Sequence, residues 1–198
     1  MEDKQELYNI KELIYMSFPK YLKSDVAQII KILPINKPVI NSNGEEIPFV
    51  HEIIEQVLID SEEIKINSRI YFDEPHMINE EKLNTIQRTI LNCLYSGHHN
   101  GHIRQTRIEN LLKSNDYFTI PFIISNAGGY LIEILNIINE SLNENNVKLF
   151  RKFIQDNPKY WDLTKDRIVS YWNEFYRFDF CDFKDYVGSD FIKKIEAH

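Results

Sequence analysis

The sequence predicts a mainly all-α protein, built as an irregular stack or bundle of antiparallel helices with one short extended segment or hairpin in its N-terminal half. Two observations lead to this class. Apolar residues recur three and four positions apart along most of the 198-residue chain, and this spacing places them on one face of a helix. Strict alternation of apolar and polar residues is confined to residues 64–72, and one strand cannot form a sheet alone.

The first two elements are predicted helices, with apolar stripes at residues 7–14 and 26–33. Ser24 stands just before the second stripe, where its hydroxyl would accept a hydrogen bond from the first helical turn. Pro34 follows the stripe, and a proline ends a helix because it has no N–H to donate. We therefore expect a second helix that is capped by Ser24 and stops before Pro34.

A short connecting region and a third helix are expected next. The run from residue 34 to residue 48 is rich in proline and asparagine, and Asn43-Gly44 is a turn signal, so the run predicts a loop or a small hairpin. Apolar residues then repeat at helical spacing over residues 49–58, which predicts a helix. The extended segment at 64–72 follows this helix.

The rest of the chain is predicted to be helical. Apolar stripes predict helices over residues 83–94, 103–112, 121–138, 147–154 and 164–176. Asn100 is the expected cap of the second of these helices, and Pro121 is expected in the first turn of the third, where proline is tolerated. The tail is expected to end in a capped turn at Ser189.

Residues 102–138, HIRQTRIENLLKSNDYFTIPFIISNAGGYLIEILNII, resemble one unit of a HEAT-type helical repeat, with an arginine-bearing first helix and a proline-initiated second helix. The resemblance implies stacked helix pairs of the kind used as protein-binding scaffolds, and it implies no catalytic residue. The sequence contains no second copy at a spacing of roughly 40 residues, which a solenoid would have. Gly128 and Gly129 in this segment predict a close approach of another helix.

Length and composition favour one helical domain over residues 1–198, in which residues 1–74 could form a subregion packed on a helical body at 75–198. Apolar residues make up 43% of the chain, enough to fill a core, because a protein of this size buries roughly 70% of its unfolded surface. Cys93 and Cys181 lie far apart and outside any CxxC motif. This argues against a disulfide framework and favours a reducing cytoplasm.

Charge and hydropathy exclude several classes of partner. The net charge of −7 argues against DNA or RNA, because binding to phosphates needs a basic face. The N-terminal residues lack the basic start and apolar run of a secretory signal. The least polar window, residues 120–132, is shorter than the roughly 20 apolar residues of a membrane helix. We expect a soluble cytoplasmic protein whose partner is neither a membrane nor a nucleic acid.

The sequence SGHHNGHIRQTR, residues 96–107, concentrates histidine and arginine, and we name it the histidine loop. Its metal candidates are His98, His99 and His102. Imidazole nitrogens bind zinc, but the loop contains no Asp, Glu or Cys, so a further ligand such as Asp73 or Glu74 would have to come from elsewhere. The sequence therefore predicts no metal, with an open zinc-like site as the alternative.

The same loop could bind an anion or an acidic partner. The candidate binding residues are His98, His99, His102, Arg104 and Arg107. The segment from residue 97 to residue 105 contains no acid, and arginine holds a carboxylate or phosphate in a bidentate pair. The structural alternative is a helix connection in which Asn100 caps the second helix and the arginines pair with neighbouring carboxylates.

Aromatic and acidic residues are interleaved near the C-terminus, between residues 160 and 186. We expect a buried helical stripe from Trp172, Phe175 and Tyr176. The candidates for a protein interface are Phe178, Phe180, Phe183 and Tyr186. These four are interleaved with aspartates, and aromatic side chains anchor interfaces, so an acidic aromatic surface would suit a basic protein partner. Core packing is the alternative for each of them.

Taken together, these features predict a non-catalytic, acidic helical protein-interaction module of a neutralising or adaptor type, which binds another protein and needs no cofactor. The acidic balance and the stacked-helix pattern support this function, and the sequence contains no assembled catalytic motif. The alternative function is a metal- or phosphate-dependent hydrolase. Its centre would be formed by His98, His99, His102 and Arg104 of the histidine loop.

Overall fold

The computed structural model describes residues 10–35, 39–40, 43–47, 49–50, 54–67 and 69–197. The predicted mainly helical class is confirmed, since 62% of the structure is helical and the strands of the described residues form two small antiparallel sheets. The chain divides into two compact units, unit 1 at Met1–Arg107 and unit 2 at Ile108–His198. The prediction of one domain over residues 1–198, with a subregion at 1–74, stays a prediction.

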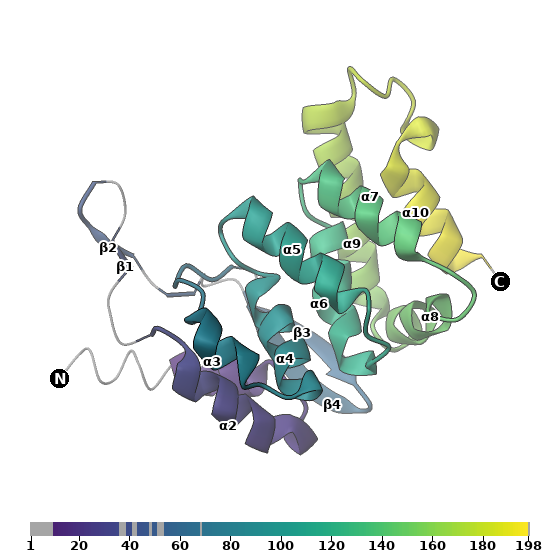
Figure 1. Cartoon of the computed structure of the whole chain (residues 1–198). Helices are drawn as coiled ribbons and strands as arrows, with labels where there is room; N and C mark the ends of the chain where they lie inside the picture. Colours follow the sequence, from purple (N-terminus) through teal and green to yellow (C-terminus); the bar gives the residue numbers. More distant parts are fainter. Residues whose placement is uncertain are drawn as a thin grey trace. The chain divides into compact units, whose positions relative to one another are not determined.

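Unit 1 begins with a helix at residues 10–16, the 3-10 turn η1 (Lys20–Leu22) and helix α2 (Lys23–Ile32) (Figure 1). Residues 7–9 of the predicted first helix lie outside the described residues. The expected cap at Ser24 is wrong, because Ser24 lies inside α2. The helix begins at Lys23, directly after η1, and no side chain caps it. Pro34 ends α2 as expected: Leu33 is extended, which is the conformation preferred before a proline.

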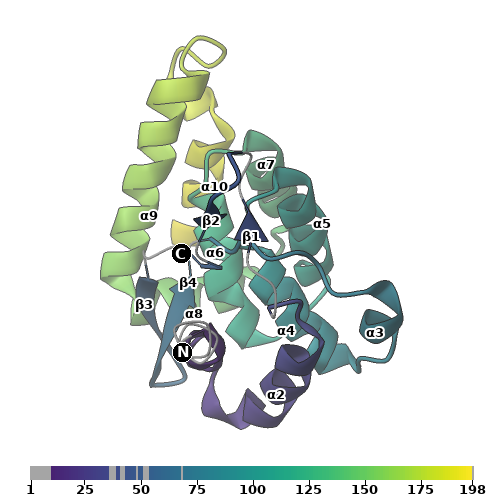
Figure 2. The same cartoon turned by 90° about the vertical axis from the view of Figure 1, so that its left-hand side faces the viewer.

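The strand pairs of unit 1 are β1 (Val39–Ile40) with β2 (Glu46–Ile47), and β3 (Ile54–Ile59) with β4 (Glu62–Asn67). The first pair confirms the predicted small hairpin, and Gly44 in its turn has a φ of +82°, which glycine tolerates best. Strands β3 and β4 form the second hairpin (Figure 2). Its turn residues Asp60 and Ser61 also have positive φ. Residues 64–67 of the extended segment predicted at 64–72 thus pair with a strand of the same chain, whereas Ile70 forms only isolated bridges, to Val50 and His98.

The helix predicted over residues 49–58 is wrong, because strand β3 occupies its second half. Val57 and Ile59 are buried while Leu58 between them is exposed, which is the alternation of a strand. Pairing with β4 decides between helix and strand, and the spacing of apolar residues in the segment itself could not. Residues 51–53 of the predicted helix lie outside the described residues.

Unit 1 continues with helices α3 (Met77–Glu81), α4 (Thr85–Tyr95) and α5 (Gly101–Leu111). The last residues of α5, after Arg107, belong to unit 2. Helix α4 begins with a capping box formed by Asn84 and Gln87. Gln87 also donates to Asp25 of α2, against which α4 packs. The predicted cap of α5 is confirmed, since the Asn100 side-chain oxygen accepts the His102 N–H at 2.9 Å.

Unit 2 contains the turn η2 (Tyr117–Thr119) and helices α6 (Ile120–Ala127), α7 (Ile132–Ser141), α8 (Val147–Asp156), α9 (Pro158–Tyr171) and α10 (Val187–Glu196). Helix α9 continues into the π-helical turn η3 (Trp172–Tyr176), and the 3-10 turn η4 (Phe183–Asp185) precedes α10. Helix α10 packs against α7, α8 and α9 (Figure 1). Phe150, Phe153 and Phe191 are buried in the core of these helices.

The single helix predicted over residues 121–138 is wrong, because Gly128 and Gly129 separate α6 from α7. Pro121 lies in the first turn of α6 as expected. The close helix approach predicted for the glycines is confirmed at Gly128, where an added Cβ would lie 3.1 Å from Thr164 Cγ2 of α9. The resemblance of residues 102–138 to a repeat unit stays a prediction.

The C-terminal helices differ from the expectations at their ends. Helix α9 starts at Pro158, earlier than the predicted start at residue 164, and Pro158 suits the first helical position. The capped turn expected at Ser189 is wrong, because Ser189 is buried inside α10, the third residue of that helix. Within the described parts of the chain, no helix combines the length and apolar character needed to cross a membrane.

Candidate functional site

The first part of the histidine loop connects α4 to α5, and backbone hydrogen bonds tie it to Ile70. The Ile70 N–H donates to the Gly97 carbonyl, and the His99 N–H donates to the Ile70 carbonyl, both at 2.9 Å. Ser96 Oγ donates to the Cys93 carbonyl at 2.7 Å. The loop backbone is therefore anchored to the rest of unit 1.

His98 is a buried structural residue of this loop. It is 2% exposed, and its Nδ1 accepts the Asn100 N–H at 3.1 Å. Because an accepting nitrogen has its lone pair engaged, the neutral ring carries its proton on Nε2. Burial and the neighbouring His99 lower the pKa of His98, against the opposite effect of a backbone hydrogen bond with Phe72. The His98 ring is thus neutral, with Nδ1 engaged by the protein.

The other two histidines are exposed. The His99 ring stacks on Tyr71, with 5.6 Å between ring centroids, and lies 4.3 Å from the His98 ring. His102 is exposed at the start of α5. Among the residues that the structure describes, no group of three or more His, Cys, Asp or Glu side chains could hold a metal ion. Arg104 of the same loop is buried.

Arg107 is 7% exposed, and all five of its N–H donors are engaged. Nε and Nη2 donate to the Glu74 carboxylate, and Nη1 and Nη2 donate to the two Glu80 oxygens at 2.6 and 3.0 Å. Nη1 also donates to Asn92 Oδ1 at 3.1 Å, and the Tyr95 ring centroid lies 5.5 Å from the guanidinium carbon. We name Arg107, Glu74, Glu80 and Asn92 the Arg107 cluster.

Of the residues predicted to bind an anion, Arg107 must be reassigned. It has no donor left for an external carboxylate or phosphate, and it matches the structural alternative in which arginine pairs with neighbouring carboxylates. Its partners Glu74 and Glu80 belong to the segment before α4, and nothing in the local sequence pattern indicates this pairing. For the exposed His99 and His102, anion or partner binding stays a prediction.

A second candidate site lies in unit 2, where aromatic side chains are exposed. Phe178 is 88% exposed, Phe175 55% and Tyr130 39%. The Tyr171 ring contacts the rings of Tyr130 and Phe175, with 6.1 Å between centroids in each pair. We name Tyr130, Tyr171, Phe175 and Phe178 the aromatic edge. Burying one phenylalanine contributes about 1.5–3 kcal/mol, and the aromatic edge leaves much of this stabilisation unused in the free protein.

A set of packed rings, which we name the aromatic base, holds the turn that carries Phe178. Its members are Trp172, Tyr176, Phe180, Phe183 and Tyr186. Tyr186 is 2% exposed, and its ring centroid lies 5.6 to 6.2 Å from three other rings of the base. Trp172 Nε1 donates to the Phe180 carbonyl at 2.9 Å, which closes the turn on both sides of Phe178. Phe178 is therefore presented to solvent by a rigid support.

Tyr176 joins the aromatic base to the segment that precedes α7. Its hydroxyl donates to the Tyr130 carbonyl at 2.7 Å and accepts the Ile132 N–H at 3.3 Å. The two parts of the aromatic edge, at residue 130 and at residues 171–178, are thus linked by hydrogen bonds through one side chain.

The four predicted interface aromatics divide into exposed and buried members. Phe178 is exposed, Phe180 and Phe183 are half-buried, and Tyr186 is buried. The alternative of core packing therefore describes Tyr186, and Phe178 is the one of the four that is freely accessible.

The buried stripe predicted from Trp172, Phe175 and Tyr176 is wrong for Phe175, which is exposed, while the other two are half-buried. The π-helical turn η3 changes the angular spacing of these residues, and a stripe drawn at the α-helical period no longer applies. The sequence interpretation also missed Tyr130 and Tyr171. The position of Tyr171, four residues before Phe175 on a helix, was the available signal for the pair.

Carboxylates lie close in sequence to the exposed rings of the aromatic edge. Glu174, Asp179 and Asp185 are exposed, and within the described residues no salt bridge engages them. Lys184 pairs with Asp182 at 2.9 Å, and the Arg177 guanidinium lies 5.7 Å from the Phe178 ring centroid. The surface next to the exposed rings therefore carries unpaired negative charge.

No protein-family model, curated protein or solved structure matches the chain.

Proposed function

We propose that the protein is a non-catalytic interaction module of a neutralising or adaptor type, which binds a basic partner protein through the aromatic edge. The observation that carries this proposal is Phe178, an 88% exposed phenylalanine on a turn held by the packed rings of the aromatic base and by the hydrogen bond from the Trp172 side chain to the Phe180 carbonyl. Exposed aromatic surface of this kind is typical of interfaces, whose binding energy concentrates in a few aromatic and arginine side chains.

Rigidity of the support favours binding. A turn whose backbone is already ordered loses little conformational entropy when a partner covers it, so more of the burial energy is available as affinity. The aromatic base supplies this order through the Tyr186 ring contacts and the hydrogen bond from Trp172 to Phe180. We expect Phe178 to fill an apolar pocket of the partner, with Phe175 and Tyr130 covering its margin.

Charge determines the kind of partner. Glu174, Asp179 and Asp185 would face the partner beside the exposed rings, and opposite charge speeds association and selects partners. A basic surface with an apolar pocket is therefore the expected complement. Association should slow as salt is added, because exposed charges are screened over about 10 Å at 0.1 M ionic strength.

The hydrolase alternative receives less support from the histidine loop. His98 accepts a backbone N–H at Nδ1, and Arg107 donates all its hydrogen bonds to side chains of unit 1. A catalytic role would need these groups to face a substrate. The interaction module is therefore the function that we propose.

The test uses Cys181, which is exposed three residues from Phe178, while Cys93 is buried. A thiol-reactive photo-crosslinker attached at Cys181 captures the partner from cell extract at physiological salt, and mass spectrometry identifies it. The dissociation constant of the purified partner is then measured for the unmodified protein and for Phe178→Ala. We expect about thirtyfold weaker binding by Phe178→Ala, the size of one interface hot spot.

The matched control is Met77→Ala, which removes a 70% exposed apolar side chain from α3 in unit 1. Its dissociation constant should stay within about twofold of the unmodified value. Equal binding by Phe178→Ala and the unmodified protein would exclude the aromatic edge as the interface. Folded, labelled protein that captures no partner at physiological salt would contradict the interaction function itself.

A further inference from the structure

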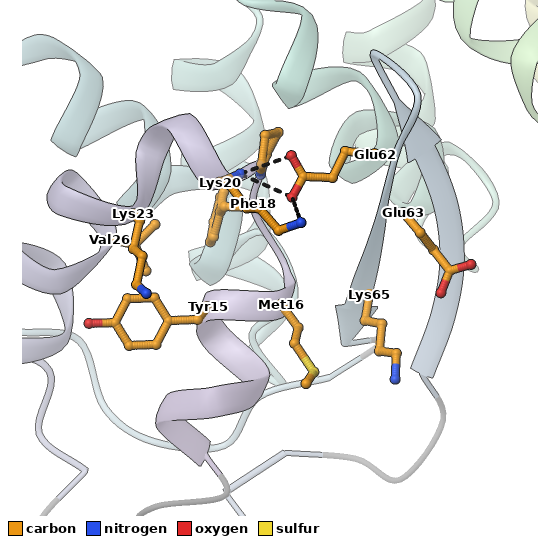
Figure 3. Close-up of a pocket in the computed structure, with 10 residues that line it drawn as sticks. Tyr15, Met16, Phe18, Lys20, Lys23, Val26, Glu62, Glu63 and Lys65 are labelled. Carbon is orange, nitrogen blue, oxygen red and sulfur yellow. Dashed lines mark hydrogen bonds and ion pairs between the residues drawn. The ribbon is translucent and has the colours of Figure 1, made fainter.

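Unit 1 contains a pocket of about 330 Å³ that the aromatic edge does not involve (Figure 3). The end of the first helix, η1 and α2 form one wall, and strand β4 forms the other. Tyr15, Met16 and Phe18 give it an apolar lining, and Met16 is 45% exposed. Pockets that bind small molecules are lined in this way, mainly by apolar side chains with a few polar groups that fix the orientation of the ligand.

The charged groups at the pocket are unequally engaged. The Glu62 carboxylate accepts the Lys20 backbone N–H at 3.0 and 3.2 Å and pairs with the Lys20 ammonium at 3.7 Å (Figure 3). Within the described part of the chain, Lys23 and Lys65 have no ion-pair partner. Glu63 also lines the pocket, and it lies on the same face of β4 as Lys65, since alternate residues of a strand share a face.

This arrangement places two unpaired cations on opposite walls of an apolar pocket, in a chain whose net charge is −7. Lys23 comes from α2 and Lys65 from β4. A lysine keeps its ammonium group in water while its alkyl stem lines apolar surface, so both charges can meet a ligand at the mouth of the pocket. The three lysines and two glutamates of the lining leave a net local charge of +1, which favours an anion, and the apolar lining favours a hydrocarbon body.

We propose that this pocket binds a small carboxylic acid with an apolar body. The body lies against Tyr15, Met16 and Phe18, and the carboxylate is held by Lys23 and Lys65. A volume of about 330 Å³ accommodates roughly eleven non-hydrogen atoms if each takes about the 30 Å³ of a water molecule in the liquid. A chain of about ten carbons fits this size. The site lies in unit 1 and is independent of the proposed protein-binding function.

Methionine methyl groups allow a direct test, because Met16 lines the pocket and Met77 is exposed on α3, outside the pocket lining. Full-length protein with ¹³C-methyl methionine is titrated with decanoate below its micelle concentration, and the signals are assigned with Met16→Leu and Met77→Leu. We expect a saturable shift of the Met16 signal and a constant Met77 signal. Decanol, which has the same chain without the charge, should bind about fivefold or more weakly, as expected for the loss of one charge pair.

Lysine variants separate the contribution of charge to decanoate binding from the contribution of apolar contact. Lys23→Gln and Lys65→Gln should each weaken decanoate binding by about threefold to fivefold at low salt. Lys31→Gln is the matched control, since Lys31 is an exposed lysine of α2 that does not line the pocket, and it should leave binding unchanged. Thermal unfolding of each variant verifies that the fold is retained.

Three outcomes would overturn the proposal. The first is a Met16 signal that stays unshifted up to the highest soluble decanoate concentration in folded protein. The second is equal binding of decanol and decanoate with no effect of either pocket lysine, which would leave no role for the anion. The third is an equal shift of Met16 and Met77, which would indicate nonspecific association with the surface.

Discussion

The Arg107 cluster and the aromatic edge reverse the usual distribution of side chains in opposite ways. In unit 1 a guanidinium group is buried, with 8% of the Arg107 side chain exposed. In unit 2 a phenyl ring is placed in water, with 88% of Phe178 exposed. Both are unfavourable in isolation, because a buried charge loses hydration and an exposed ring forgoes burial.

The Arg107 cluster and the aromatic edge differ in whether the rest of the protein offsets this unfavourable free energy. All five Arg107 donors find acceptors inside unit 1, so the cluster is complete without any external molecule. Phe178 has no comparable burial, although the packed rings of the aromatic base hold the turn that carries it. The burial of Arg107 is explained by folding, because its hydrogen bonds offset the lost hydration. The exposure of Phe178 on a supported turn has no such explanation and indicates binding to a partner.

The largest effect on stability is expected from Arg107→Met, which keeps an apolar stem and removes the charge. Breaking a buried ion pair costs about 3–5 kcal/mol, and we expect about 2–3 kcal/mol here because Glu74 and Glu80 are 37% and 29% exposed and can regain water. Urea unfolding followed by circular dichroism measures the change in the free energy of unfolding. Arg88→Met, in an exposed arginine of α4, is the control; similar losses in both variants would refute the structural role of the Arg107 cluster.

Gly188→Ala tests whether the packing of the aromatic base is needed to support the aromatic edge. A Cβ at this position would lie 2.3 Å from Ile168 Cγ2 and 2.7 Å from Tyr186 Cε1, so the aromatic base must shift. Overpacking of this kind costs about 1–3 kcal/mol, and we expect about 2 kcal/mol by urea unfolding. Partner binding should weaken as well, although Gly188 is buried. Full affinity in a destabilised variant would show that the rigid base is not needed for binding.

Much of the fold could be predicted because local signals agree with the final structure. Asn100 caps α5 and Pro34 ends α2 through interactions within a few residues, and these short-range rules transfer directly from sequence. Strand β3 was missed because its apolar residues also fit a helical period, and only pairing with β4 decides between the two.

The candidate sites were less predictable for the same reason. The ion pairs of Arg107 join residues separated by 27 and 33 positions, and no local pattern specifies them. The sequence identified Phe178 and Tyr186 as interface candidates together, yet the π-helical turn and the packing on α10 expose one ring and bury the other. Composition indicated the region, and tertiary contacts determined the role of each side chain.

A smaller effect, visible only as a dependence on pH, is expected from His98. Its pKa in the folded protein is lowered below the ordinary value of 6.5, by burial first and by His99 second. Below about pH 6.5 the unfolded chain binds a proton that the folded chain does not, so stability is full above this pH and falls as the pH decreases. We expect unfolding free energies at about pH 5.5 and 7.5 to differ less in His98→Gln than in the unmodified protein. His102→Gln, at an exposed position, should keep the original difference; an unchanged difference in His98→Gln would contradict the assignment.

The smallest change in stability is expected from Phe178→Ala, and this small value sharpens the contrast between the two regions. A ring that is 88% exposed contributes little burial, so the free energy of unfolding should change by less than about 0.5 kcal/mol. A loss above about 1 kcal/mol would mean that Phe178 packs against its own protein, and the ring would then be compensated internally in the same way as Arg107. Only substitution of an interface residue leaves stability unchanged and weakens partner binding. Substitution of a structural residue lowers both, and substitution of a surface residue outside the interface lowers neither.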